Sequence, residues 1–358
     1  MRMPGLDLLR IVAGVALIVC HGGYWLAPFH LPDTLWMLLG HMGVEVFLVS
    51  FGFLLAERAL RRTPAPSVRQ DSLRSLVRLW PLYVVFLLCN LVLLPADAER
   101  PHLIAYLTLT QNLAWPHPRF FGEAWIVAAA AMVALAVPIT CRMLRQQTFR
   151  SGLLVIFGLL VAGQAVRGLL VVLGEPPFDE GVRRILIARL DLPFYGVLVA
   201  WFWIHRYEAI MRWRGWLAVV SLCMLVATSS IHLWVPLDTS LAARILLFPL
   251  GDFTWAALLP WVCSMDASRT MGRSARVLAA SAYSGLLTHM TLLRLADAKG
   301  LSMTASEPAT GVLLLLSYAL LSIGVALLVS LALDRSLLDF LARRFAPVAE
   351  HGVPVAER

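Results

Sequence analysis

Ten long apolar segments dominate this chain of 358 residues. A segment of about 20 apolar residues is long enough to cross the hydrocarbon core of a membrane as one helix. With 59% hydrophobic and 15% charged residues, the chain carries more apolar surface than one globular core can bury. The sequence therefore predicts an all-α, polytopic integral membrane protein with about ten transmembrane helices. The segments lie at 6–27, 34–56, 77–95, 121–141, 152–173, 190–205, 215–235, 245–263, 276–296 and 309–333.

Two shorter stretches are assigned separately. Residues 100–115 are semi-apolar and are predicted to form a re-entrant or interfacial helix rather than a span. The last residues, 346–358, follow the final apolar segment, and we expect them to form a short, loose cytoplasmic tail. Residues 1–345 are then one transmembrane domain.

The basic residues gather on one side of this predicted arrangement. Of the 30 lysine and arginine residues, 20 fall at the termini or in the loops after the second, fourth, sixth and eighth segments. The positive-inside rule places such loops in the cytoplasm, so both termini are predicted to be cytoplasmic, as an even number of spans requires. This topology explains the net charge of +8 without a nucleic-acid partner. The five cysteines lie in apolar runs without paired spacing, and no metal site is predicted.

The first apolar segment contains two ionisable groups, which are costly inside a membrane. Arg10 and His21 are eleven residues apart, so a helix places them within about 20° of one face and roughly 16 Å apart along the axis. A guanidinium can bind phosphate bidentately, and an imidazole can take a proton from a hydroxyl. In the alternative interpretation, Arg10 anchors the helix to lipid headgroups and His21 is a satisfied interior histidine.

Other polar groups also interrupt the apolar segments. Glu45 needs a partner in the second segment, and His41 lies one turn earlier on the same face. Gln164 and Arg167 are one turn apart and are predicted to face the interior of the bundle. Further polar positions at segment ends, each also compatible with anchoring or packing, are Arg78, Glu123, Arg189, His289 and Arg294.

Several ordered motifs resemble the acyltransferase-3 family of integral-membrane O-acyltransferases. Leu6-Asp7-Leu8-Leu9-Arg10 followed by His21 is similar to the opening motif of that family, in which Asp7 belongs to the pattern. The later similarities follow in the family's order and span nearly the whole chain. They lie at residues 43–53, 78–83, 189–200 and 281–289.

The resemblance implies an O-acyltransferase of the bacterial cell inner membrane. It implies that acyl-CoA, with acetyl the expected group, is the donor from the cytoplasm and that Arg10 contributes to its site. His21 would assist transfer to a hydroxyl of an exopolysaccharide, O-antigen or other envelope glycan, as a general base or as a transient acyl carrier. The resemblance implies no bound cofactor. The expected partners are acyl-CoA, a glycan or lipid-linked saccharide and membrane lipid.

One departure from the family pattern concerns a carboxylate. Trp125 and Pro138 keep the family spacing, but Ala130 stands where a glutamate is expected. Glu123 lies seven residues earlier, on the same helical face about two turns away. Three alternatives stay open: a catalytically weakened member of the family, a transporter or flippase of lipid-linked saccharides, and a non-catalytic membrane scaffold or sensor. Supporting roles are assigned to Asp7, Glu45, Arg78, Glu123, Arg189 and His289.

Overall fold

The computed structural model describes residues 3–23, 25–26, 33–63, 67–94, 101–115, 119–265, 273–299, 305 and 307–334. Within these ranges the chain is helical and contains no strand. The α-helices are α1 (Pro4–Gly22), α2 (Asp33–Arg61), α3 (Val68–Val92), α4 (Leu103–Leu107), α5 (Ala124–Leu144), α6 (Phe149–Gly174), α7 (Leu192–His205), α8 (Tyr207–Trp234), α9 (Leu241–Cys263), α10 (Arg273–Ala280), α11 (Ala282–Ala298) and α12 (Pro308–Val329). Short 3₁₀ or π-helical turns are η2 (Arg119–Phe121), η3 (Phe178–Arg183), η4 (Leu186–Arg189) and η5 (Ser330–Asp334).

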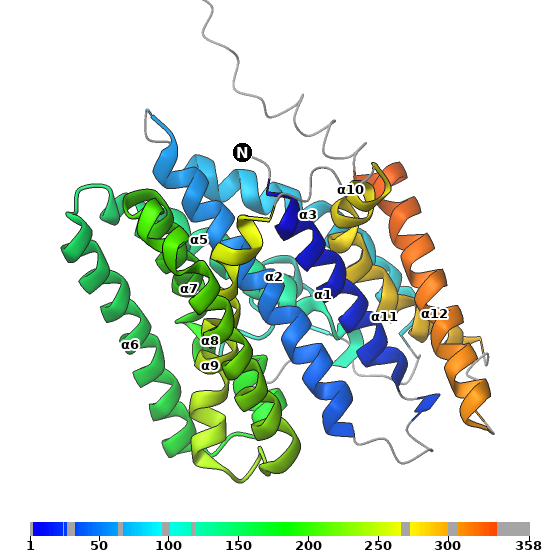
Figure 1. Cartoon of the computed structure of the whole chain (residues 1–358). Helices are drawn as coiled ribbons and strands as arrows, with labels where there is room; N and C mark the ends of the chain where they lie inside the picture. The colour runs from blue at the N-terminus through cyan, green and yellow to red at the C-terminus, as the bar shows by residue number, and fades with distance from the viewer. Residues whose placement is uncertain are drawn as a thin grey trace, which may run out of the picture.

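Nine helices of the described part are long and apolar enough to cross a membrane. They confirm the prediction of an all-α polytopic membrane protein. In Figure 1, α1 and α2 lie in the middle of the bundle, and α6 and α12 lie at opposite edges of the view. The start of α1 and the end of α12 lie at the same face (Figure 1). Which face is cytoplasmic stays a prediction, and the proposed boundary at residues 345–346 lies outside the described residues.

The ninth expected span, 276–296, is divided into α10 and α11. The helices separate at Ser281, whose hydroxyl donates to the carbonyl oxygen of Leu278 at 2.9 Å. Such side-chain bonds to the backbone compete with the hydrogen bonds of a continuous helix. With 17 residues, α11 is about 26 Å long, which is near the lower limit for a span.

The helix expected over residues 100–115 is much shorter than predicted. Only α4, of 5 residues, is α-helical there. The Thr108 hydroxyl donates to the carbonyl oxygen of Ile104 at 2.7 Å, and Leu109 has a φ of 59°. This left-handed residue ends the helix because a second turn cannot continue through it.

The connection between α6 and α7 enters the protein interior instead of forming a surface loop. Phe178, Val182 and Arg183 in η3 are buried, as is Arg189 in η4. This segment therefore supplies charged side chains to the interior of the bundle, where they shape the site described below.

The backbones of α2 and α7 approach closely at Gly196. A Cβ atom added there would lie 2.4 Å from the backbone nitrogen of Phe53 and 2.6 Å from the carbonyl oxygen of Val49. Glycine is therefore required at this crossing, because small residues let membrane helices pack backbone to backbone.

We expect Gly196→Ala to destabilise the protein by about 1–3 kcal/mol, because the added methyl group must push two helices apart. Thermal unfolding of the detergent-solubilised protein measures this effect. Gly158→Ala in α6 is the matched control, since an added Cβ there meets no described atom within 4 Å. Equal unfolding temperatures for the two variants would contradict the close approach.

Candidate functional site

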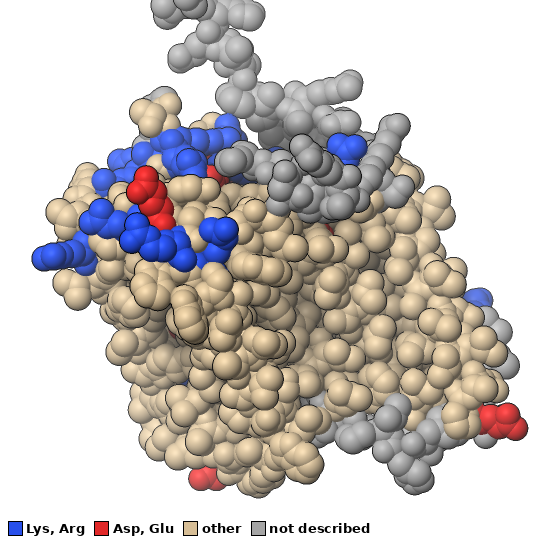
Figure 2. Space-filling model, viewed as in Figure 1, with Lys and Arg blue, Asp and Glu red and all other residues tan. Residues whose placement is uncertain are grey.

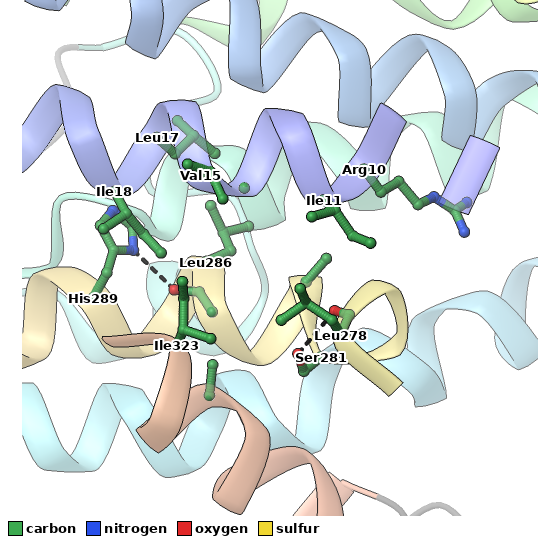
Figure 3. Close-up of a pocket in the computed structure, with 14 residues that line it drawn as sticks. Arg10, Ile11, Val15, Leu17, Ile18, Leu278, Ser281, Leu286, His289 and Ile323 are labelled. Carbon is green, nitrogen blue, oxygen red and sulfur yellow. Dashed lines mark hydrogen bonds between the residues drawn. The ribbon is translucent and has the colours of Figure 1, made fainter. Parts of the chain in front are cut away.

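The two ionisable residues of α1 lie at opposite ends of that helix. Arg10 is near its start and pairs with Asp7 at 4.0 Å. His21 is in its last turn. Figure 3 shows Arg10 and His289 at opposite ends of a narrow space of about 40 Å³ that runs along α1. The described structure therefore keeps the separation that the sequence spacing predicts.

His21 and His289 form a close pair between α1 and α11. Their ring centroids are 5.1 Å apart. The Nδ1 atom of His289 donates to the carbonyl oxygen of Gly285 at 2.9 Å (Figure 3). Since a carbonyl oxygen only accepts, a neutral His289 carries its proton on Nδ1 and a lone pair on Nε2. That Nε2 atom is buried without a hydrogen-bond partner among the described residues, so it is free to accept a proton.

The histidine pair lines a cavity of about 620 Å³, which we call the histidine cavity. Its volume lies within the range of about 300–1,000 Å³ typical of small-molecule sites. The wall is unusually polar for the interior of a membrane bundle. Its polar lining residues are His21, His41, Glu123, Asp179, Glu180, Arg183, Arg184, His289 and Arg294.

Three ion pairs occupy two different walls of the histidine cavity. Arg294 lies 3.4 Å from Oε2 of Glu123, whose Oε1 has no hydrogen-bond partner among the described residues. On the other wall, Asp179 pairs with Arg183 at 2.9 Å and also with Arg184. Burial works to raise the pKa of Asp179, but the two guanidinium groups outweigh it and hold that pKa below its ordinary value.

A second space opens among arginines at the other end of α1. Figure 2 shows lysine and arginine side chains gathered on the face where α1 begins. A space of about 230 Å³, which we call the basic mouth, is lined there by Arg10, Arg58, Arg74 and Arg78, with Asp71 beside them. Four guanidinium groups around one small space suit an anion with several phosphate oxygens.

An apolar passage of about 300 Å³ lies between the basic mouth and the histidine cavity. Arg10 and Arg78 line both the mouth and the passage, and Ile126 lines both the passage and the histidine cavity. Phe47, Phe51 and Ile126 contribute to the apolar wall of the passage. The passage therefore shares wall residues with both the basic mouth and the histidine cavity.

Ala130, the position of the missing family glutamate, lines the apolar passage. Glu123 does not take its place, because it lies at the start of α5 and lines the histidine cavity instead. The residue immediately before α5 thus supplies one of the carboxylates that line the histidine cavity. The substitution at Ala130 makes the passage apolar without removing a charged group from the histidine cavity.

Glu45 and Arg189 belong to a different, fully buried ion network. Arg189 lies 2.6 Å from Glu45 and 3.2 Å from Asp252 of α9. The prediction that His41 is the partner of Glu45 was wrong, because His41 forms its hydrogen bond with His232 of α8. Neither Glu45 nor Arg189 lines the histidine cavity, so their place in the structure is to hold α2, η4 and α9 together.

A second buried pair confirms the interior orientation of the polar residues of α6. Arg167 pairs with Asp191, and Gln164 donates to the same carboxylate at 2.9 Å. Arg167 also donates to the carbonyl oxygen of Ala188 at 2.7 Å. These bonds attach α6 to the segment that enters α7.

Several residues of the histidine cavity were not predicted as site residues from the sequence. Asp179, Arg183 and Arg184 were not singled out from the sequence. His41 was assigned to Glu45, and His232 was not considered. The available signal was a pair of arginines in an otherwise acidic connection, which is unusual on the side of a membrane that is poor in basic residues.

The helices and spaces define an integral-membrane protein with a histidine-lined cavity beyond an arginine-lined mouth. A scan against protein-family models matches residues 3–335 to acyltransferase 3, described as an acyltransferase domain. The match covers nearly the whole chain, so the chain belongs to the acyltransferase-3 family and is a membrane acyltransferase. Searches of curated proteins and of solved structures gave no match.

Proposed function

We propose that this protein transfers an acyl group from acyl-CoA to a hydroxyl of an exopolysaccharide, O-antigen or other envelope glycan. We place it in the bacterial inner membrane as a multi-pass protein, with acetyl as the expected group. The observation that carries the proposal is the row of three spaces that leads from four arginines to a pair of histidines.

The basic mouth suits the phosphate groups of the donor. Arg10 and Arg78 lie where the mouth meets the apolar passage, so they would bind the pyrophosphate at the entrance. The pantetheine arm, which carries little charge, would then occupy the passage. Along α1 the route covers roughly the 16 Å that separate Arg10 from His21. This arrangement brings the thioester to the histidine pair while the charged nucleotide stays at the mouth.

The histidine pair suits the chemistry of transfer. The hydroxyl oxygen of the acceptor attacks the thioester carbonyl carbon, a C–O bond forms, the C–S bond breaks and coenzyme A leaves. The hydroxyl proton must go to a base, and the free Nε2 of His289 beside His21 supports this role for the pair. His21 acts either as the base itself or as the group that carries the acyl transiently, and both versions need it beside the thioester.

The polar walls of the histidine cavity suit a sugar. Hydroxyl groups both donate and accept hydrogen bonds. The cavity has unpaired acceptors in Oε1 of Glu123 and Nε2 of His289. Two of its three lining arginines, Arg183 and Arg184, each have an Nε atom without a hydrogen-bond partner among the described residues. Because buried polar groups normally find partners, these atoms favour a polyhydroxylated ligand over an apolar one.

We expect deletion of the gene and the His21→Ala substitution to remove the same ester acyl signal from the envelope polysaccharide. Proton NMR of polysaccharide from the deletion strain, complemented with each variant, measures this loss. His102→Ala is the control and should restore the signal, because His102 is exposed before α4 and does not line the histidine cavity.

An identical acyl pattern in the wild-type and deletion strains would overturn the transferase proposal for this acceptor class. If the amount or export of glycan changed instead, the alternative of a transporter for lipid-linked saccharides would be supported. Loss of the signal in the deletion strain together with full restoration by His21→Ala would remove His21 from the mechanism.

A further inference from the structure

A second pair of histidines lies at the histidine cavity and has no part in the transfer chemistry described above. His41 of α2 lines the cavity, and its ring contacts that of His232 from α8, with 4.7 Å between the centroids. His41 is 4% exposed and His232 is 3% exposed. Two imidazoles from helices far apart in the sequence are thus buried together beside an open space.

The hydrogen bonds of this pair fix the position of each proton. Nδ1 of His232 lies 3.0 Å from the carbonyl oxygen of Thr228, so it donates its proton there. Nε2 of the neutral His232 ring is then an acceptor, and it receives the proton on Nδ1 of His41. Nε2 of His41 therefore carries a lone pair. This atom is buried without a hydrogen-bond partner among the described residues.

The surroundings of His41 explain which ligand could use this lone pair. Its Nε2 atom lies 4.0 Å from Asp179, which Arg183 and Arg184 hold by ion pairs. The Phe178 ring packs against His41, with 5.5 Å between the ring centroids. The wall thus presents a fixed hydrogen-bond acceptor next to guanidinium donors. A hydroxyl group can donate to the former, and a neighbouring hydroxyl on the same ring can accept from the latter.

We propose that His41, oriented by His232, binds a hydroxyl group of the sugar acceptor and so positions that sugar opposite the His21 and His289 pair. This inference rests on the proposed function and assigns a specific part of the cavity wall to the acceptor. His232 acts only through His41, because its own nitrogen atoms are occupied by Thr228 and His41.

Two conservative variants of His41 separate binding from structure. An asparagine amide group reaches about as far as Nδ1 of histidine, so His41→Asn can keep the bond to His232 but lacks the acceptor that faces the cavity. A glutamine amide group reaches about as far as Nε2, so His41→Gln can restore that acceptor. If His41 serves only to hold α2 and α8 together, His41→Asn should preserve activity and His41→Gln should lose it.

The test uses the purified full chain in detergent, acetyl-CoA as donor and envelope polysaccharide from the deletion strain as acceptor. We expect His41→Asn to raise the KM for the acceptor about three- to tenfold, as for one lost hydrogen bond, with the donor KM unchanged. His41→Gln should stay within about twofold of wild type, and His232→Leu should resemble His41→Asn because it frees the ring of His41. Thermal unfolding of each variant is measured alongside.

An unchanged acceptor KM in His41→Asn would overturn the assignment, as would a change confined to the donor KM. A stable, fully active His41→Asn beside a destabilised His41→Gln would show a structural role only and would also overturn it. Failure of the transferase proposal looks different, because wild-type protein would then transfer no acyl group to the polysaccharide.

Discussion

Replacing His289 with alanine is expected to lower the rate of acyl transfer by about 10²–10⁴-fold, the usual contribution of a positioned general acid or base. Nε2 of His289 carries a buried lone pair at the cavity where we place the thioester. The rings of His289 and His21 are 5.1 Å apart between their centroids. The backbone bond to Gly285 holds this ring in the required tautomer. Donor binding should persist, because the basic mouth lies at the other end of α1.

The measurement compares the rate of coenzyme A release with equilibrium binding of acyl-CoA, using the purified full chain and a glycan acceptor. His102→Ala serves as the control histidine, since its side chain is exposed and outside the cavity. A rate within threefold of wild type for a folded His289→Ala protein would exclude His289 from the proton transfer. Loss of donor binding together with the rate would indicate instead that the substitution damages the fold.

Replacing Arg189 with leucine is expected to destabilise the protein by about 3–5 kcal/mol, the usual cost of breaking a buried ion pair. Arg189 is 2% exposed and lies between the carboxylates of Glu45 and Asp252. Without the guanidinium, two carboxylates remain side by side in a site that excludes water. The native arrangement of α2, η4 and α9 is then lost or requires uptake of protons.

Yield of monodisperse protein and thermal unfolding in detergent measure this effect. Arg214→Leu is the matched control, because Arg214 is exposed in α8 and its side chain donates to the carbonyl oxygen of Met211, one turn earlier in the same helix. The double variant Arg189→Leu, Glu45→Gln should recover part of the stability, since one of the unpaired charges is removed. A stable Arg189→Leu single variant would contradict the importance of this network.

The apolar segments of the sequence predicted most of the fold because membrane spans depend on local composition. The division of span 276–296 at Ser281 was missed, since one serine inside an apolar segment gives no warning of a helix end. The helix predicted over residues 100–115 was too long, because the amino-acid composition does not show that Leu109 adopts a left-handed backbone conformation.

The candidate site could be predicted only where its residues share one helix. The helical period predicted that Arg10 and His21 lie on one face of α1. The contact between His21 and His289 joins residues of two helices far apart in the sequence, and no local pattern predicts it. For the same reason Glu45 was assigned to its neighbour His41 instead of Arg189, which lies 144 residues away. Local spacing identifies charged groups in a membrane, but only the packing of helices shows which of them pair.

The network around Arg189 also bears on how the chain enters the membrane during synthesis. Glu45 is inserted long before Arg189, and Asp252 follows 63 residues after that arginine. Until the later helices emerge, the carboxylate in α2 has no permanent counterion and must stay protonated, hydrated or shielded by the insertion machinery. The counterion arrives with Arg189, and Asp252 of α9 then adds a second carboxylate to the same guanidinium group. A ribosome that stops before residue 189 therefore leaves a partial membrane protein in which the carboxylate of α2 lacks its partner.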